Sequence, residues 1–283
     1  MKICLIGQNL TNLILATVFA EKKLNVDIYI NKKIHNIKTI RTIALSSENF
    51  VFLKSLTKSS INHWKIKEIK IFTEDSQIKD KIKFNNKNKD VFNLILYSKL
   101  NELFLKKVKK SKFVRLLNLD ISSQQMLKKI KFYDLVINSE NKNFISKQFF
   151  TNKIKKDYRS RAYTFLINHL SKDNKLAIQV FTKFGPLAFL PLTNTKTSVV
   201  FSYKGEKISD HKILDIFKKY NSFYSITKIS KIEKFALSFE MLRNYTHKNI
   251  LAFGDLIHRI HPLAGQGFNM TIRDIKIMSK IVN

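Results

Sequence analysis

The opening of the chain, residues 1–30, follows an order of elements that few folds accommodate. Residues 2–6 form a short apolar run suited to a buried parallel strand, residues 10–23 carry apolar side chains at helical spacing, and residues 26–30 have the pattern of a second strand. A strand, a helix and a strand in this order make a β-α-β unit, in which both strands lie parallel in one sheet. The opening therefore predicts a parallel sheet of the kind found in α/β folds.

The turn between the first strand and the helix has the places of the dinucleotide-binding pattern G-x-G-x-x-G, but only the first glycine. Gly7 can make the tight turn, whereas Asn9 and Asn12 stand where two further glycines would admit a pyrophosphate and pack helix against strand. Asparagine tolerates a left-handed backbone, so the turn itself remains possible. The acidic residue expected after the second strand is replaced by Ile30 or Asn31. Taken alone, this turn fits a plain β-α-β unit as well as a nucleotide site.

The rest of the chain alternates strands and helices less regularly. Apolar runs predict strands at 66–72, 79–84, 113–119, 132–138 and 249–253, with a polar turn at 85–90. At least three more strand candidates lie between residues 158 and 203, around Gly185. Amphipathic patterns predict a long helix over 91–110, a short one over 212–220, and a last helix from Asn269 onward.

Residues 251–274 carry the most specific pattern in the chain, L-A-F-G-D-L-I-H-R-I-H-P-L-A-G-Q-G-F-N-M-T-I-R-D. The segment resembles the second flavin motif of the para-hydroxybenzoate-hydroxylase-like monooxygenases, in the form H-P-L-A-G-Q-G-x-N-x-x-x-R-D that is typical of the ubiquinone-biosynthesis hydroxylases. Gly254 would let the cofactor pass, the Asp255 carboxylate can accept hydrogen bonds from ribityl hydroxyls, and Gly265 and Gly267 open a helix N-terminus with free N–H groups. An ordinary glycine-rich loop is the alternative, and about a dozen matching positions in order disfavour it.

Three further segments match the family in the expected order. Residues 41–46 resemble its R-x-x-A-L-S segment, and residues 181–192 resemble its F-T-x-x-G-P-x-A-L-L-P-L strand pair in the substrate domain. Residues 133–137 resemble the strand before the family's G-A-D-G turn, where this chain has Glu140 in place of the acid and Asn141 in place of glycine. The family continues for more helices beyond the R-D pair than the single helix these 283 residues hold.

The resemblance implies a FAD-binding, Rossmann-like doubly wound domain with an inserted, largely antiparallel substrate sheet. We expect the FAD-binding domain to combine residues 1–70, 92–150 and 240–283, and the substrate domain to combine residues 71–91 and 151–239. The backbone of Pro262 and Gly265 is expected to line the reacting face of the flavin. The expected cofactor-binding residues are Gly7, Asn9, Asn12, Arg41, Gly254, Asp255, Gly265, Gln266, Gly267 and Asn269.

The implied activity is that of a monooxygenase that uses FAD, NAD(P)H and dioxygen to hydroxylate an aromatic polyprenyl phenol of ubiquinone biosynthesis. Such an enzyme would contact an isoprenoid substrate and could work within a ubiquinone-biosynthesis complex. The degenerate turn at Asn9 and Asn12 keeps open a second interpretation, a catalytically inactive relative that serves as a scaffold or accessory subunit. A basic nucleic-acid-binding protein is the third.

The net charge of the chain bears on the interpretation as a nucleic-acid-binding protein. The chain has 52 Lys and Arg residues against 21 Asp and Glu residues, a formal net charge of +31, enough to raise binding to nucleic acid or to an anionic membrane. Lys, Asn, Ile and Phe are abundant while glycine (6) and proline (3) are scarce, as AT-biased codon usage would produce, and the lysines are scattered along the chain. Because a nucleic-acid site concentrates its basic residues on one face, we expect no specific nucleic acid partner.

Cysteine usage and apolar stretches suggest a location. The single cysteine, Cys4, leaves no intramolecular disulfide, which favours a reducing compartment and the cytoplasm. No stretch is apolar and long enough to span a bilayer, so we expect at most peripheral contact with anionic lipid on the inner membrane face. His258 and His261 have metal-ligand spacing, but Asp255 is the one further ligand nearby, and we expect no metal site.

Overall fold

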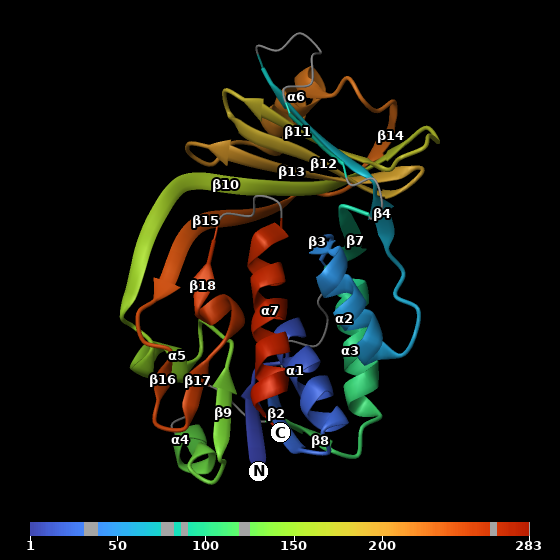
Figure 1. The fold of residues 1–283 in the computed structure, drawn as a ribbon. Helices are drawn as coiled ribbons and strands as arrows, with labels where there is room; N and C mark the ends of the chain where they lie inside the picture. Colours follow the sequence, from blue (N-terminus) through green and yellow to red (C-terminus); the bar gives the residue numbers. More distant parts are fainter. Residues whose placement is uncertain (31–38, 75–81, 86–89, 119–124, 261–264, 283) are drawn as a thin grey trace.

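The parallel sheet that the opening of the chain predicts is present, with six strands (Figure 1). In the computed structural model, which describes residues 1–30, 39–74, 82–85, 90–118, 125–260 and 265–282, its strands in spatial order are β16 (Thr246–His247), β17 (Ile250–Ala252), β9 (Leu135–Asn138), β1 (Lys2–Ile6), β2 (Asn25–Ile30) and β8 (Val114–Asn118). β1 pairs in parallel with β2 and β9, and the outer strands β8 and β17 continue the parallel order. β16 runs antiparallel to β17. The doubly wound sheet is thus confirmed.

Helices cover both faces of this sheet because the side chains of β1 alternate between two apolar cores. Ile3 and Leu5 pack with α1, α3 and α7 on one face, and Cys4 and Ile6 pack with α4 and α5 on the other. The helices are α1 (Leu10–Glu21), α2 (Ser47–Thr57), α3 (Tyr97–Lys109), α4 (Gln125–Ile130), α5 (Phe144–Phe149), α6 (Asp210–Tyr220) and α7 (Gln266–Ile281). A 3-10 turn, η1 (Gly254–Leu256), follows β17.

A nine-stranded, largely antiparallel sheet lies across one end of the six-stranded sheet (Figure 1). In spatial order its strands are β18 (His258–Arg259), β15 (Glu233–Leu242), β10 (Lys153–His169), β13 (Lys196–Lys204), β12 (Gly185–Thr193), β11 (Leu176–Thr182), β5 (Glu68–Thr73) and β6 (Ile82–Asn85), and β14 (Ile226–Ile229) also pairs with β10. β11 and β5 form its parallel pair. The expected antiparallel substrate sheet is therefore present, and the residue limits of the two domains stay a prediction.

One predicted element is wrong: residues 91–110 are not one helix. β7 (Phe92–Leu96) comes first and lies between β3 (Thr42–Ser46) and β4 (Trp64–Ile66) in a three-stranded antiparallel sheet, and α3 begins only at Tyr97. Residues 93–95 are buried in this small sheet. Pairing with strands from elsewhere in the chain overrides the helical pattern of so short an apolar run.

Other predicted boundaries move by a few residues. The strand predicted at 66–72 is divided into β4 and β5 at Lys67, whose N–H donates to the oxygen of Lys175 at 3.0 Å. Residues 153–204 hold four strands where at least three were expected, and α7 begins at Gln266, three residues before Asn269. Parts of the predicted strand 79–84 and turn 85–90 lie outside the described residues.

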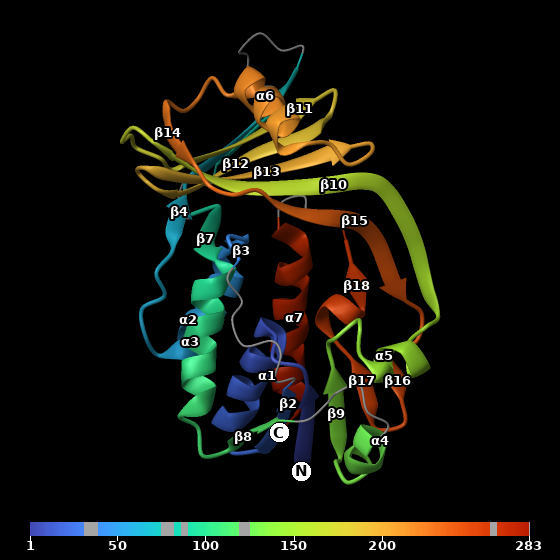
Figure 2. The ribbon, with the colours of Figure 1, turned by 180° about the vertical axis from the view of Figure 1, so that it is seen from behind.

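Helix α7 joins the two large sheets. Its C-terminal end packs beside α1, and its N-terminal end points at the nine-stranded sheet, in both views (Figures 1 and 2). Among the described residues no helix is long and apolar enough to cross a membrane.

Candidate functional site

Three predicted segments meet where neighbouring parallel strands end. The turn after β1 begins at Gly7, the turn after β9 holds Ser139 and Glu140, and the turn after β17 holds Gly254 and Asp255. The chain leaves β1 toward β2 on one side, while β9 and β17 lie on the other, so the order of strands reverses at β1. Ligands of doubly wound sheets bind at the carboxyl ends of strands at such a point.

The turn after β1 is held by its own side chains. Asn9 is the N-cap of α1, and its side chain accepts a hydrogen bond from the N–H of Asn12 at 3.0 Å. The buried Asn12 amide donates to the oxygens of Ile6 and Gly7, both at 2.7 Å, and its oxygen accepts from Ser139. Asn12 therefore stabilises the turn from inside, and its contact with a cofactor stays a prediction.

Glu140 closes over the same turn. Its Oε1 accepts a hydrogen bond from the Asn9 amide at 3.1 Å, and a Cβ built on Gly7 would lie 2.3 Å from that oxygen. Gly7 has φ +98, so both the backbone and the carboxylate require glycine there. Burial raises the pKa of Glu140 above its ordinary value, and the charge of Asp255 adds to the effect, while the bond from Asn9 opposes it.

The other half of the site is the start of α7. Gly265 is its N-cap with φ +65, and a Cβ built there would lie 3.0 Å from the backbone oxygen of Ala44 in β3. Asn269 donates to the oxygens of Ala44 and Gly265 and accepts from the Ser46 N–H and the Asn49 amide. Because its donors are used within the protein, Asn269 positions α7 against β3, and its expected contact with a cofactor stays a prediction.

A cavity of about 320 Å³ separates the start of α7 from the nine-stranded sheet. One wall comes from Arg41, Asp255, Gly265 and Gly267, and the opposite wall comes from small and apolar side chains of β10, β11, β12, β13 and β15. Thr42, Thr164 and His258 also line it, and in each a buried polar atom has no hydrogen-bond partner: Thr42 Oγ1, Thr164 Oγ1 and His258 Nε2. Buried polar atoms without partners are rare in folded proteins, so this wall has hydrogen-bonding capacity left for a ligand.

The remaining predicted residues divide between the cavity and places outside it. Arg41 is exposed and lies over the ring of Tyr97, with its guanidinium carbon 5.4 Å from the ring centre. Gln266 is exposed at the first position of α7 and does not line the cavity. Pro262, expected beside the reacting ring, lies outside the described residues.

Residues of the cavity that the sequence did not indicate come from the other sheet. Thr164 in β10 and Ala188 in β12 carry no local signal, because nothing in a strand's own pattern shows which face meets another domain. Tyr97, which lies beside the turn after β1 and does not line the cavity, was missed because the predicted helix over 91–110 gave no reason to place it there. Its hydroxyl accepts from the Leu10 N–H at the start of α1 at 3.3 Å.

The two halves of the site differ in how they fit a flavin dinucleotide. The α7 half fits a ring system, because it combines a glycine-lined helix start, apolar walls and polar atoms without partners. At the turn after β1, N–H groups of α1 are bonded within the protein, those of Leu10 to Tyr97 and of Asn12 to Asn9, and Glu140 covers Gly7. A diphosphate fits there only after Glu140 has moved.

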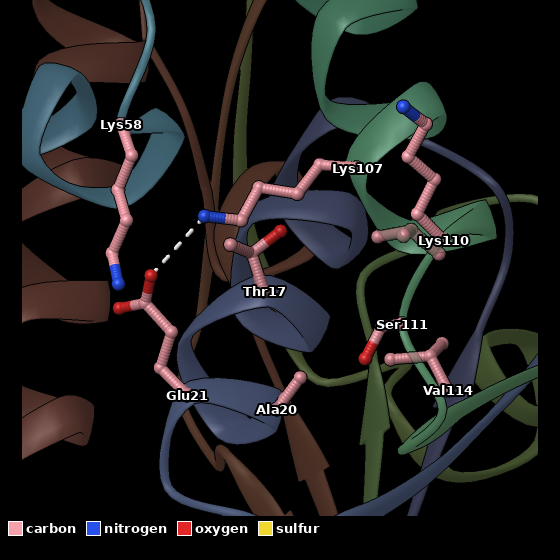
Figure 3. A pocket seen from close by; sticks show the side chains of 9 residues that line it. Thr17, Ala20, Glu21, Lys58, Lys107, Lys110, Ser111 and Val114 are labelled. Atoms are coloured by element: carbon pink, nitrogen blue, oxygen red, sulfur yellow. Dashed lines mark hydrogen bonds and ion pairs between the residues drawn. The ribbon is translucent and has the colours of Figure 1, made fainter.

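A second cavity of about 320 Å³ lies at the opposite end of α1 (Figure 3). Lys58, Lys107 and Lys110 surround it, but the Lys107 ammonium lies 3.1 Å from the Glu21 carboxylate across it. It is remote from the strand ends that carry the predicted residues.

No arrangement of three or more His, Cys, Asp or Glu side chains within the described ranges could hold a metal ion. His258 is buried in β18, and His261, its partner in the H-x-x-H spacing, lies outside those ranges.

Known proteins resemble this chain in both sequence and structure, although no protein-family model matches it. The chain is 21% identical over 131 residues to the ubiquinone hydroxylase UbiL of Rhodospirillum rubrum, a match covering 44% of this chain and 30% of the relative. It is 28% identical over 154 residues to the ubiquinone biosynthesis monooxygenase COQ6 of Xenopus tropicalis, covering 39% of this chain and 33% of the relative. The match thus spans about a third of these relatives' own length.

Solved structures match over nearly the whole chain. Residues covering 98% of the chain superpose on p-nitrophenol 4-monooxygenase PnpA of Pseudomonas putida with a TM-score of 0.78 and 9% identity, over 78% of that chain. PqsL of Pseudomonas aeruginosa in complex with 2-aminobenzoylacetate matches 99% of this chain and 85% of its own with a TM-score of 0.74 and 14% identity. The fold is that of the flavin-dependent aromatic monooxygenases. The resemblance predicted from residues 251–274 is thereby confirmed.

Proposed function

We propose that this chain is a FAD-dependent monooxygenase that hydroxylates an aromatic ring. The observation that carries the proposal is the cavity between the start of α7 and the nine-stranded sheet, because it joins the glycines of the flavin-like motif to an apolar wall. A bound flavin would supply the reducing electrons and transfer one atom of dioxygen, with NAD(P)H as the expected electron donor.

The residues of the chain would bind, orient and exclude water. The start of α7 would offer N–H groups to the electron-rich edge of the ring system, and Gly265 and Gly267 would keep side chains away from its face. The hydroxyls of Thr42 and Thr164 can rotate to meet polar atoms of a ligand, since each lacks a partner. Aliphatic and small residues of β12 and β13 would keep the ring dry.

For the substrate we propose a phenol intermediate of ubiquinone biosynthesis that carries an isoprenoid tail. The support is the sequence similarity to proteins named ubiquinone hydroxylase and ubiquinone biosynthesis monooxygenase. The net charge of +31 would favour contact of the protein with an anionic membrane, where such a substrate resides. Binding to vesicles should then rise with anionic lipid and fall with salt, and equal binding to neutral vesicles at high salt would contradict this part of the proposal.

The visible absorbance spectrum of the purified protein tests the cofactor, and complementation tests the reaction. We expect a bound flavin spectrum and restored ubiquinone in a strain that lacks one ring hydroxylase. A protein that is folded and loaded with FAD but restores no ubiquinone at any hydroxylation step would contradict the proposed substrate.

A scaffold or accessory subunit is the second candidate, and one observation favours it. The turn after β1 is filled by Asn9, Asn12 and Glu140, so the dinucleotide half of the site is occupied by the protein itself. Absence of flavin from the protein after purification and after incubation with excess FAD would favour the scaffold over the enzyme.

A further inference from the structure

The two faces of the nine-stranded sheet carry side chains of different size. α6 lies on the face that is turned away from α7 in both views, and the strands fill that face with large apolar side chains (Figures 1 and 2). Phe165, Phe189 and Phe201 belong to this core, and side chains alternate between the two faces along each strand. The face toward α7 carries the alternate residues, which are smaller and line the cavity: Ala162, Thr164, Ala188, Val200 and Ser202. Their small size leaves the space that the cavity occupies.

Strand pairing continues this cavity face to the edge of the sheet. One row of paired residues begins in the cavity wall and ends in β6, in the order Val200, Ala188, Gln179, Ile71 and Ile82. A second row runs beside it from β11 through β5 to β6, in the order Ala177, Ile69 and Phe84. Because paired residues of neighbouring strands point to the same face, the wall of the cavity and these outer strands form one surface.

The outer part of this surface is apolar and open to solvent. Ile82 and Phe84 in β6 are 49% and 50% exposed, and Phe181 in β11, on the same face, is 41% exposed. The charged residues of β5 and β6 alternate with the apolar ones and lie on the opposite face: Glu68, Lys70 and Lys83. Exposed apolar side chains gathered on one face are typical of binding surfaces. An apolar track thus leads from the cavity to the sheet edge, formed by Ala177, Ile69, Ile71, Ile82 and Phe84.

The cavity changes in character toward the apolar track. Near α7 its wall is polar, with the Asp255 carboxylate and the Arg259 guanidinium. Beside β5 its wall consists of apolar side chains from the nine-stranded and the three-stranded sheet: Ile66, Ile69, Phe92 and Leu94. The apolar track therefore leaves the cavity at its apolar end. This continuity favours an occupant that combines a polar ring with a long apolar chain over a partner that covers only the outer surface.

We propose that the apolar track binds the isoprenoid tail of the aromatic substrate, with the ring in the cavity and the tail extended across β11, β5 and β6. The proposal rests on the proposed function as a hydroxylase of such a ring, and it adds the subsite for the tail. From Ala188 in the cavity wall to Ile82 the row crosses three strand spacings, about 14 Å, which about three extended isoprene units would span. The first unit then lies over Ala177 and Ile69, and the third lies over Ile82 and Phe84.

The test varies the length of the tail and measures binding by calorimetry, with the protein incubated in excess FAD. The probes are phenol and phenols that carry one, two or three isoprene units on the carbon next to the hydroxyl, each below its micelle-forming concentration. The double variant Ile82→Asn/Phe84→Asn makes the exposed end of the apolar track polar. Phe132→Asn/Ile281→Asn is the matched control, because both residues are exposed and neither lines the cavity. Circular dichroism establishes that each variant is folded.

A second variant acts nearer the cavity. Ala177→Phe places a large side chain between the cavity and β5, at a position where alanine is buried. Trp64, the one tryptophan of the chain, packs against the cluster that contains Ala177. Its fluorescence therefore reports a tail that lies in the apolar track, and this readout does not depend on catalysis.

In wild type each added isoprene unit should tighten binding about five- to tenfold, less than full burial of its carbons would provide, because the apolar track is partly exposed. The double variant should lose the gain from the third unit and bind phenol as wild type does. Ala177→Phe should still bind phenol and should lose the gain from the second unit onward. The control should match wild type at every tail length.

Three outcomes separate the subsite from the proposed function. Equal gains with tail length in wild type, the double variant and Ala177→Phe would overturn the subsite, and hydroxylation of the probes by the same protein would leave the proposed function standing. Loss of the gains in the variants of a protein that hydroxylates no probe supports the subsite and contradicts the proposed function. Weaker binding of the double variant to vesicles of phosphatidylcholine and phosphatidylglycerol, with unchanged gains for the tails, would assign Ile82 and Phe84 to the membrane and overturn the proposal.

Discussion

The amide nitrogen of Asn269 in α7 lies 2.7 Å from the backbone oxygen of Ala44 in β3, across 225 residues of sequence. The same side chain bonds to the oxygen of Gly265, the N-cap of its own helix. Asn269 therefore fixes the start of α7 against the strand that forms one wall of the cavity. A residue of the flavin-like motif thus acts on the shape of the site from inside the protein.

Replacing Asn269 with alanine should destabilise the fold. The substitution leaves the Ala44 oxygen, the Ser46 N–H and the Asn49 amide without this partner in a buried place, which should lower the free energy of unfolding by about 2–4 kcal/mol. Urea denaturation measures the change. Lys280→Ala, on an exposed position of the same helix, is the control and should shift stability by less than about 0.5 kcal/mol.

Gly265 and Gly267 should respond differently to alanine. At Gly265 the φ of +65 and the oxygen of Ala44 at 3.0 Å from a built Cβ oppose any side chain, so Gly265→Ala should cost about 1–3 kcal/mol. At Gly267 the nearest atom is 3.7 Å away, and no positive φ is present, so Gly267→Ala should leave stability unchanged or raise it by about 0.5 kcal/mol. Thermal unfolding of both variants, compared side by side, checks the contrast. Equal loss in both would mean that Gly265 is not strained by its neighbours.

The sequence indicated the parallel sheet because its signals are local. In β1 every residue from Ile3 to Ile6 is apolar and buried, and the following helix begins at the N-cap Asn9. The same reasoning failed at β7, where a five-residue strand leads directly into α3. So short a run carries no period that separates strand from helix, and its pairing with β3 and β4 is decided by residues far away in sequence.

The site was predictable where backbone geometry demands a residue type. Gly7, Gly254 and Gly265 all have positive φ. The dinucleotide pattern indicated Gly7, and the flavin-like motif indicated Gly254 and Gly265. The structural roles of the two asparagines were not predictable. In the sequence, Asn12 shows only that a glycine of the dinucleotide pattern is absent, and Asn269 shows only that the flavin-like motif is matched. Their partners, the oxygens of Gly7 and Ala44, appear only once the chain is folded.

Placing glycine at position 12 should lower the stability of the fold, although the dinucleotide pattern has glycine at this position. Asn12→Gly removes the bonds to the oxygens of Ile6 and Gly7 and the bond from Ser139, and it places glycine in the first turn of α1, so unfolding should become easier by about 2–4 kcal/mol. Asn9→Gly should cost less, since glycine is accepted at an N-cap. Chemical denaturation of the two variants ranks them. The reverse ranking would mean that the hydrogen bonds of Asn12 do not hold the turn.

The stability of the fold should depend on the charge of Asp27 in acid. Asp27 is buried in β2 and accepts from Nε and Nη2 of Arg115, each at 2.7 Å, and from the Tyr133 hydroxyl at 2.6 Å. Burial alone would raise the pKa of Asp27, but these bonds bring it below its ordinary value of 3.8. Because the pKa of Asp27 is lower in the folded protein than in the unfolded chain, the ionised carboxylate stabilises the fold at any pH above the ordinary pKa. This contribution is lost as the pH falls through the lower pKa of the folded state.

Asp27→Asn tests this dependence. Wild type should be the more stable of the two at neutral pH, and the difference should shrink as pH falls below about 4. Urea denaturation at a series of pH values measures it, with Asp173→Asn, an exposed residue on another turn, as the control that should track wild type. A constant difference down to the acid limit would show that the pair with Arg115 is not what lowers the pKa.

FAD binding should depend on the carboxylate of Asp255. Asp255 is exposed at the mouth of the cavity, and its backbone oxygen accepts from Asn141 at 2.9 Å, so removal of the side chain leaves the bonding of the turn intact. A charge-assisted hydrogen bond is worth about 1.5–3 kcal/mol, so Asp255→Ala should weaken FAD binding about ten- to a hundredfold, and Asp255→Asn, which keeps an acceptor, should lose less. Quenching of flavin fluorescence measures the affinity, and Asp173→Ala controls for the lost negative charge. No loss of FAD affinity in Asp255→Ala would mean that Asp255 does not bind FAD.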